Sequence, residues 1–260
     1  MMTQVKTASQ VAAMRESGRM LATVLSFLKT KVEPGVSTKE LADMAADELQ
    51  KLGGEPTFKG YQGFPDVICI SLNNEVVHGI PSAKRIIQDG DIVSLDFGVT
   101  YRGMITDSAL SMIAGRAKQR GHMEIVANTE KALAIGIAEV HDQVRTGDIG
   151  AAIEKFLNSK HYGIVRDLVG HGVGHQLHED PNIPNYGRSG SGPYLSKGMT
   201  IAIEPMATLG TDRVLIAPDH WTVLTTDNSW AAHFEHTVLI TEDGAEILTT
   251  LEITDITESR

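Results

Sequence analysis

Two aspartates, Asp96 and Asp107, lie in the segment DIVSLDFGVTYRGMITDSALSMI, which has the pattern of two β-strands joined by a tight turn. If the turn is centred between Tyr101 and Arg102, the two aspartates are equally far from it and face each other. Opposed residues of such a hairpin have Cα atoms about 4.5–5.5 Å apart and side chains on one face. Carboxylates that close repel each other unless a cation lies between them. The hairpin therefore predicts a carboxylate pair that binds a cation.

Three further residues have the chemistry of metal ligands: His171 in GHGVGHQLHED, Glu204 in MTIAIEP and Glu235 in HFEHTVLI. A lone acidic residue usually lies at the surface, but Asp96 and Glu204 interrupt strands that are otherwise apolar, where an unpaired carboxylate is costly. Four carboxylates and one imidazole, without a thiolate, predict a site for two divalent ions, which could be Mn²⁺, Fe²⁺, Co²⁺ or Zn²⁺. Such ions lower the pKa of water toward ~7 and favour hydrolysis of an amide, ester or phosphoester.

Three more histidines lie near these segments. His78 stands in NNEVVHGIP, and His175 and His178 follow the glycine-rich segment GHGVG. A single histidine is more often structural or exposed than functional, and His175 stays ambiguous on this ground. The GHGVG segment does not have the glycine spacing of a dinucleotide-binding fingerprint.

Apolar periodicity and capping residues predict four helices, separated by strands. Ser37 and Glu40 have the capping-box pattern, and Gly53 is expected to end that helix. The predicted helices cover 8–30, 37–52, 122–142 and 148–160, and the predicted strands cover 67–72, 91–113, 199–204, 221–226, 233–240 and 245–250. Two helices followed by strands thus occur twice, which predicts an α+β fold and one domain over 1–260.

Composition excludes several classes of protein. The chain has 23 basic and 33 acidic residues, a net charge of −10, which argues against nucleic acid as the main partner. The single cysteine, Cys69, cannot form an intramolecular disulfide, and the N-terminus lacks a secretory signal pattern. No apolar run reaches the ~18 residues of a membrane span. A cytoplasmic protein without a membrane partner is expected.

Five segments, SLNNEVVHGIP, SLDFGVTYRGMITDSA, GHGVGHQLHEDP, GMTIAIEPM and FEHTVLIT, closely resemble the signature segments of type I methionine aminopeptidases. The resemblance extends from KTASQVAAMRESGRMLA to about residue 248. It implies the pita-bread fold, a curved and largely antiparallel sheet backed by two helix pairs with pseudo-twofold symmetry. It also implies removal of the N-terminal methionine of nascent chains, with two metal ions held by Asp96, Asp107, His171, Glu204 and Glu235.

The same resemblance implies roles for residues around the metal site. Glu204 would also transfer the proton, and His78 and His178 would contact the substrate. The methionine pocket would be formed by Tyr61, Phe64, Cys69, Leu177 and Trp221, although Cys69 and Trp221 are also plausible as plain core residues. The chain departs from the family pattern with Ala231 and His233, where serine and glutamine are usual, with Leu177, where an aromatic residue is common, and with Ser108 in place of threonine.

Two alternatives share the expected fold. An aminopeptidase P or prolidase has the same five ligands, but the segment HGIP and the residues His236-Thr237 after Glu235 match the methionine enzymes better. A non-catalytic binding protein on the same scaffold typically lacks ligands that this chain retains. A monomer is expected, and the ribosome is a possible docking partner.

Overall fold

The computed structural model describes residues 3–251 and contains the four predicted α-helices in that range. They are α1 (Ala8–Lys29), α2 (Thr38–Leu52), α3 (Arg120–Ala138) and α4 (Thr146–Ser159). The largest difference from the prediction is at the end of α3, which lies at Ala138 rather than at 142. There the backbone N–H groups of Glu139 and Val140 bond to carbonyls three residues earlier, which tightens the last turn and ends the helix.

The ends of α1 and α2 follow from the capping residues in the sequence. Ser37 Oγ accepts a hydrogen bond from the N–H of Glu40 (3.2 Å), and the Glu40 carboxylate accepts one from the N–H of Ser37 (2.8 Å). Thr7 and Gln10 form the same reciprocal pair at the start of α1. Gly53 ends α2 with a left-handed φ of 79°, a conformation that costs glycine little.

The hairpin that the sequence predicts is formed by β4 (Ile92–Tyr101) and β5 (Met104–Ile113), but its turn lies one residue later than expected. Tyr101 pairs with Met104, so the turn consists of Arg102 and Gly103, with φ of 49° and 74°. Two left-handed residues form the short turn whose twist matches that of the flanking strands. Only one of these two positions carries the glycine that signals such a turn.

The position of the turn changes how the two aspartates pair. Asp96 lies opposite Ala109, and Asp107 lies opposite Gly98. The expectation that the two aspartates face each other directly is therefore wrong. They are diagonal neighbours instead, and they stay on one face of the sheet because the pairing moves by two residues, the repeat of a strand.

The main sheet has nine strands and is antiparallel throughout. Its order is β1-β4-β5-β14-β9-β7-β8, with β2 also paired to β4 and β15 to β14, and two small sheets have the orders β13-β10-β6 and β11-β12-β3. The remaining elements are β1 (Glu55–Pro56), η1 (Tyr61–Gly63), β2 (Cys69–Leu72), β3 (Glu75–Val77), β6 (Gly163–Ile164), β7 (Gly170–Gly172), β8 (Glu179–Ile183), β9 (Thr200–Ile203), β10 (Met206–Thr208), β11 (Val214–Ile216), β12 (Val223–Thr225), β13 (Ala231–His233), β14 (Glu235–Ile240) and β15 (Ala245–Ile247).

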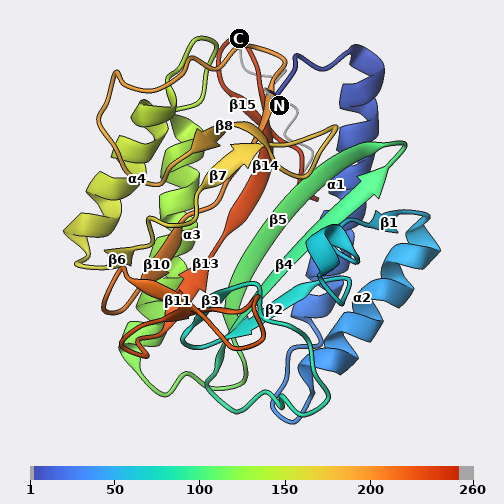
Figure 1. Cartoon of the computed structure of the whole chain (residues 1–260), viewed down its shortest axis with the longest axis vertical. Coiled ribbons are helices and arrows are strands. Elements are labelled where there is room, and N and C mark those ends of the chain that lie inside the picture. Colours follow the sequence, from blue (N-terminus) through green and yellow to red (C-terminus); the bar gives the residue numbers. More distant parts are fainter. Residues whose placement is uncertain (1–2, 252–260) are drawn as a thin grey trace.

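Two hydrophobic cores lie between this sheet and the helices. One joins α1 and α2 to β4, with Leu95 and Phe97 fully buried, and the other joins α3 and α4 to β9 and β14. Figure 1 shows the pair α1 and α2 on one side of the view and the pair α3 and α4 on the other, with the strands of the sheet between them. Because side chains alternate along a strand, Asp96 points away from the helices, between the inward-facing Leu95 and Phe97.

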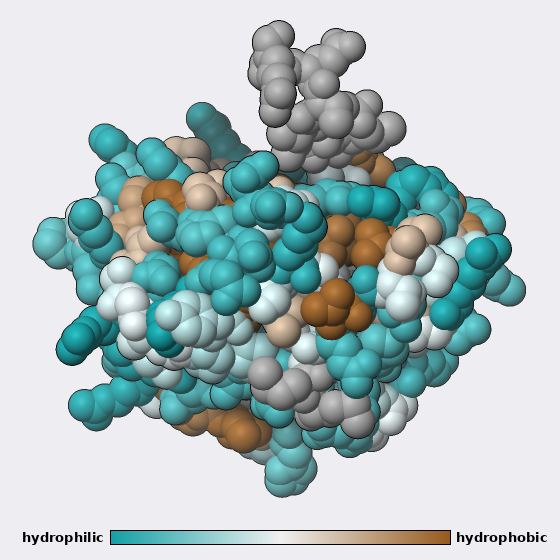
Figure 2. Space-filling view, turned by 90° about the horizontal axis from the view of Figure 1, so that it is seen from above, coloured by the Kyte–Doolittle hydropathy of each residue, from teal (hydrophilic) through white to brown (hydrophobic). Residues whose placement is uncertain are grey.

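The outer surface is largely polar. Figure 2 shows hydrophilic residues over most of one face, with hydrophobic residues exposed in small separate areas. Within residues 3–251, no helix is both long enough and apolar enough to cross a bilayer.

Candidate functional site

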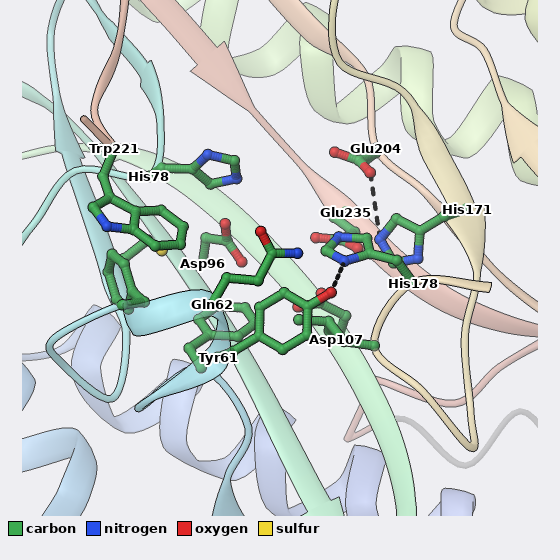
Figure 3. A pocket seen from close by; sticks show the side chains of 14 residues that line it. Tyr61, Gln62, His78, Asp96, Asp107, His171, His178, Glu204, Trp221 and Glu235 are labelled. Atoms are coloured by element: carbon green, nitrogen blue, oxygen red, sulfur yellow. Dashed lines mark hydrogen bonds and ion pairs between the residues drawn. The ribbon is translucent and has the colours of Figure 1, made fainter. Parts of the chain in front are cut away.

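A pocket contains all of the residues that the sequence analysis assigned to the site (Figure 3). Strands supply four of the five metal-ligand candidates, Glu204 directly follows a strand, and loops supply most of the other residues. The predicted residues in its lining are Tyr61, Phe64, Cys69, His78, Asp96, Asp107, His171, Leu177, His178, Glu204, Trp221 and Glu235, and Phe58 and Gln62 complete it.

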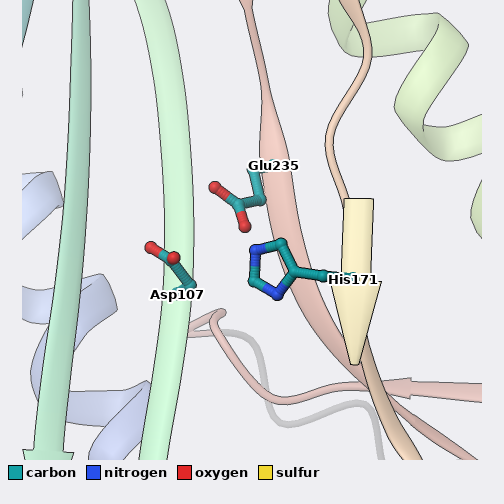
Figure 4. Close-up of side chains that lie close together, drawn as sticks. All are labelled: Asp107, His171 and Glu235. Atoms are coloured by element: carbon teal, nitrogen blue, oxygen red, sulfur yellow. The ribbon is translucent and has the colours of Figure 1, made fainter. Parts of the chain in front are cut away.

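Three strands bring Asp107, His171 and Glu235 together. They come from β5, β7 and β14, and one possible ligand atom of each lies within 4.8 Å of the others (Figure 4). β14 pairs with β5 on one side, where Glu235 lies opposite Ala109, and with β9 on the other. The order of the strands in the sheet, which differs from their order in the sequence, therefore brings these three residues together.

Glu204 and Asp96 lie next to this cluster. Glu204 follows the last residue of β9, and its Oε1 is 3.6 Å from Nε2 of His171. Asp96 is on β4, diagonal to Asp107 on the same face of the hairpin. All five predicted ligands thus surround one end of the pocket.

Three carboxylates of this group are buried, and each has one oxygen that lacks a partner. Asp96, Asp107 and Glu235 are 8%, 4% and 2% exposed, and each has a buried oxygen that accepts no hydrogen bond within the described part of the chain. Burial raises the pKa of Asp96 to about 7. Burial, together with the charges of the neighbouring carboxylates, raises the pKa of Asp107 and Glu235 well above their usual range. Burial and the charge of Asp96 raise the pKa of Glu204 to about 8.

This environment fits divalent cations. In the described residues, no lysine or arginine forms an ion pair with any of the four carboxylates, so positive charge has to come from elsewhere. A buried carboxylate without a partner is expensive, and a bound cation removes the cost while keeping the group ionised. Oxygen ligands with one imidazole suit Mn²⁺, Fe²⁺, Co²⁺ and Zn²⁺.

His171 is held in the tautomer that a metal ligand requires. Its Nδ1 is 2.9 Å from the carbonyl oxygen of Gly172, and because a carbonyl can only accept, Nδ1 carries the proton. Nε2, which faces Glu204, therefore has a free lone pair. Burial lowers the pKa of His171 to about 3, so the imidazole stays neutral.

His178 and Tyr61 form a pair at the rim of the pocket. The Tyr61 hydroxyl is 2.8 Å from Nδ1 of His178, and the His178 ring also meets His171 edge-on, with 4.3 Å between ring centroids. Burial lowers the pKa of His178. Since a tyrosine hydroxyl is a good donor, this contact favours the tautomer with the proton on Nε2 of His178.

His78 follows β3 and has a left-handed backbone, with φ of 61°. This conformation is uncommon for a residue with a Cβ and is often found at functional sites. Burial, and then the charge of His178, lowers the pKa of His78 to about 4, which makes it a neutral imidazole near pH 7. Its ring lies edge-on to Trp221, with centroids 6.4 Å apart.

The other end of the pocket is apolar. Phe58, Phe64, Cys69 and Leu177 are buried in one cluster, and Trp221 packs edge-on against Phe64 at 5.1 Å between centroids. Burial, followed by the charge of Asp96, raises the pKa of Cys69 well above its usual range, so the thiol is protonated and acts as an apolar wall. This region suits an unbranched apolar side chain.

The sequence analysis missed Phe58 and Gln62 as lining residues and gave His233 no role in the site. Phe58 reaches the pocket because Gly98 has no side chain: a Cβ there would lie 2.6 Å from the Phe58 ring. Gln62 is at the exposed side of the pocket, beside Tyr61 in η1. His233 is buried, with Nε2 at 3.8 Å from Oε2 of Glu204. No periodic pattern connects 58–62 to the distant strands. His233 stands out in the sequence only as a departure from the pattern of the family that the chain resembles.

The model of metallopeptidase family M24 matches residues 12–242. A methionine aminopeptidase of Mycoplasma capricolum subsp. capricolum is 46% identical to this chain over 252 residues, which are 96% of this chain and 100% of that protein.

Solved structures have the same fold. A methionine aminopeptidase from Thermotoga maritima superposes with a TM-score of 0.94 at 42% identity, over 96% of this chain and 100% of that one. A prolidase from Pyrococcus furiosus gives a TM-score of 0.76 at 23% identity, over 95% of this chain and 66% of that one. The second likeness extends to the fold alone.

Proposed function

Because this chain belongs to metallopeptidase family M24, we infer that it acts as its close relatives are named, as a methionine aminopeptidase that removes methionine from the N-terminus of proteins. It has the pita-bread fold of that family. The observation that carries this function is the pocket itself, where a buried cluster of metal-ligand side chains adjoins an apolar cavity wall. The first part suits hydrolysis and the second suits a thioether side chain.

We propose that Asp96, Asp107, His171, Glu204 and Glu235 hold two divalent ions. The support is the set of buried oxygens without partners and the neutral, correctly protonated imidazole of His171. When bound, such ions supply a water molecule of lowered pKa and polarise the carbonyl group of the substrate.

Three residues are proposed to act on the peptide bond. Glu204 accepts the proton of the attacking water and passes it to the leaving amine, a role that its position beside His171 in the site supports. His178 donates from Nε2 to the carbonyl oxygen of the scissile bond, because Tyr61 occupies its Nδ1. His78, neutral near pH 7, contacts the peptide nitrogen.

The apolar end of the pocket is proposed to select methionine. An unbranched thioether can lie among Phe64, Cys69, Leu177 and Trp221, where contacts of sulfur with aromatic edges contribute ~0.3–1.5 kcal/mol. Tyr61 closes this end near His178. A charged first residue would lose its hydration there without gaining a partner.

The setting of the enzyme is also a proposal. We propose a cytoplasmic monomer in which 1–260 forms a single catalytic domain, with nascent chains as substrates and the ribosome as a docking partner. The free, buried Cys69 agrees with a reducing compartment, and the continuous sheet that joins the two hydrophobic cores agrees with one domain.

Peptide cleavage and metal content test this function together. Protein loaded with Mn²⁺ or Co²⁺ should release methionine from Met-Ala-Ser and should not cleave Ala-Pro or Lys-Ala peptides, whereas chelator-treated protein should be inactive. Faster cleavage of Ala-Pro than of Met-Ala-Ser would favour the prolidase alternative. Two bound ions without cleavage of any peptide would favour a non-catalytic binding protein.

A further inference from the structure

His233 is a buried histidine with no hydrogen bond to either ring nitrogen within the described part of the chain. It is 2% exposed. Unpartnered buried nitrogens normally cost ~1–3 kcal/mol, so an imidazole in this position calls for a functional explanation.

The backbone of His233 is fixed to the β4–β5 hairpin. Its N–H donates to Ser111 Oγ, and the same hydroxyl donates to its carbonyl oxygen, both at 2.8 Å. Ser111 is in turn 2.7 Å from the hydroxyl of Ser94 on the neighbouring strand. The side chain therefore starts from a backbone position on β13 that is held against the hairpin carrying Asp96 and Asp107.

Glu204 lies between two imidazoles. Its Oε1 is 3.6 Å from Nε2 of His171, and its Oε2 is 3.8 Å from Nε2 of His233. The backbone carbonyl of Glu204 is anchored by Asn185 at 3.0 Å, but no described residue donates a hydrogen bond of ordinary length to its carboxylate. No described hydrogen bond therefore fixes the carboxylate in its place between the two rings.

We propose that His233 is a positioning residue for Glu204: its Nε2–H donates to Oε2, which leaves Oε1 directed toward the metal site beside His171. The proposal rests on the ligand role of Glu204 given above. An N–H···O bond is about 2.9 Å long, so the present spacing must shorten by about 1 Å, which rotation of the carboxylate can provide. A neutral imidazole has one N–H donor, and the proposed contact needs only one.

Such a contact has a measurable consequence. Hydrogen-bond partners of metal ligands orient the ligand, and their loss typically lowers metal affinity or activity by ~10–100-fold. His233→Leu keeps the apolar volume and removes the donor, and His233→Gln keeps an N–H donor. We expect His233→Leu to lower the affinity for Mn²⁺, measured by calorimetry, and kcat for Met-Ala-Ser by ~10–100-fold, with KM changed by less than about threefold. His233→Gln should restore both to within about threefold of the original protein.

Stability without metal separates positioning from a structural role. Because His233→Leu removes two unpartnered buried nitrogens, the chelator-treated variant should have a higher Tm than the original protein. A lower Tm together with unchanged metal affinity and kcat would overturn the proposal and make His233 a structural residue. Failure of His233→Gln to restore what His233→Leu loses would also overturn it.

A double-mutant cycle tests whether the effect passes through Glu204. In a Glu204→Gln background, His233→Leu should cause no further loss of Mn²⁺ affinity, and an undiminished loss there would overturn the proposal. If Glu204→Gln alone leaves affinity and kcat unchanged, the role assigned to Glu204 under the proposed function fails. That outcome differs from failure of the role proposed for His233, in which His233→Leu would leave the Mn²⁺ affinity unchanged.

Discussion

Glu179 and Glu235 are both buried glutamates on strands of the main sheet, but their surroundings are opposite. Glu179 accepts hydrogen bonds from Lys6 Nζ (3.2 Å) and from the backbone N–H groups of His175 (2.7 Å) and Gln176 (3.0 Å). Although burial alone raises the pKa of Glu179, hydrogen bonds from Thr3 and Gln176 and the charge of Lys6 together lower it. Glu235 has an oxygen without any such partner, and its pKa is raised.

The difference separates a structural carboxylate from a binding carboxylate. Glu179 ties the N-terminal segment to the turn that carries Leu177 and His178, so its partners are all supplied by the chain. Glu235 and the neighbouring carboxylates of the site have no lysine or arginine partner among the described residues. A bound cation can supply the positive charge. Burial alone does not identify a functional acid; burial without partners does.

The largest effect is expected from Asp107→Asn, which removes one unpartnered charge and keeps the shape. Affinity for Mn²⁺ should fall by more than the ~10²-fold typical of losing an outer partner, because Asp107 is proposed to bind the metal directly. Methionine release should fall with it. Calorimetry and a peptide assay measure the two effects, with Glu179→Gln as the control that should retain both ions. An Asp107→Asn protein with two tightly bound ions would remove Asp107 from the site.

The second effect concerns the partnered carboxylate. Lys6→Met leaves Glu179 buried without its cation, and breaking a buried pair on one side typically costs ~3–5 kcal/mol. Urea unfolding of the metal-free protein should show this loss. The double variant Lys6→Met with Glu179→Gln should recover much of it. Equal stability of the single and double variants would mean that the ion pair does not explain the burial of Glu179.

The third prediction uses the opposite pKa shifts. Asp96 and Glu204 have folded pKa values of about 7 and about 8, raised from 3.8 and 4.5, so the folded state holds protons that the unfolded chain releases. Their contribution to stability is complete below about pH 4 and is lost as the pH rises through 7–8. Glu179, with a lowered pKa, contributes above its ordinary value of 4.5 and loses its contribution as the pH falls.

Thermal unfolding between pH 5 and pH 8 measures this balance. The Tm of chelator-treated protein should decrease by several degrees across the range, since 1 kcal/mol corresponds to about 2–4 °C in a chain of this size. Saturating Mn²⁺ should raise the Tm most at pH 8, because binding favours the ionised carboxylates. A Tm of the metal-free protein that rises over this range would show that Asp96 and Glu204 do not hold extra protons in the folded state.

The smallest effect is expected at an ion pair whose basic partner is exposed. Arg15 pairs with Glu246 through two hydrogen bonds of 2.6 and 2.7 Å, but its side chain is 54% exposed. Arg15→Ala should cost only ~0.2–1 kcal/mol in urea unfolding, because water screens the pair. A loss as large as that of Lys6→Met would mean that burial is not what distinguishes the two ion pairs.

Local signals in the sequence predicted much of the fold. The capping pair of Ser37 and Glu40 and the left-handed Gly53 gave both ends of α2 correctly, because each acts within one helical turn. Alternation along 91–113 placed Asp96 and Asp107 on one face. The register was wrong, because Arg102 adopts a left-handed conformation that its residue type does not signal.

The sequence by itself determined the helices, the hairpin, the family and the chemical types of the candidate ligands, since these depend on neighbouring residues and on recognisable segments. The tertiary structure decided which groups meet. Asp107, His171 and Glu235 lie together only because β14 and β9 connect β5 to β7 within one sheet. Phe58 enters the pocket only because Gly98 leaves room for it. The same long-range packing left one oxygen of Asp107 and one of Glu235 without a partner among the described residues and gave Glu179 its lysine. Pairing between distant strands fixes these contacts, and no local pattern encodes it.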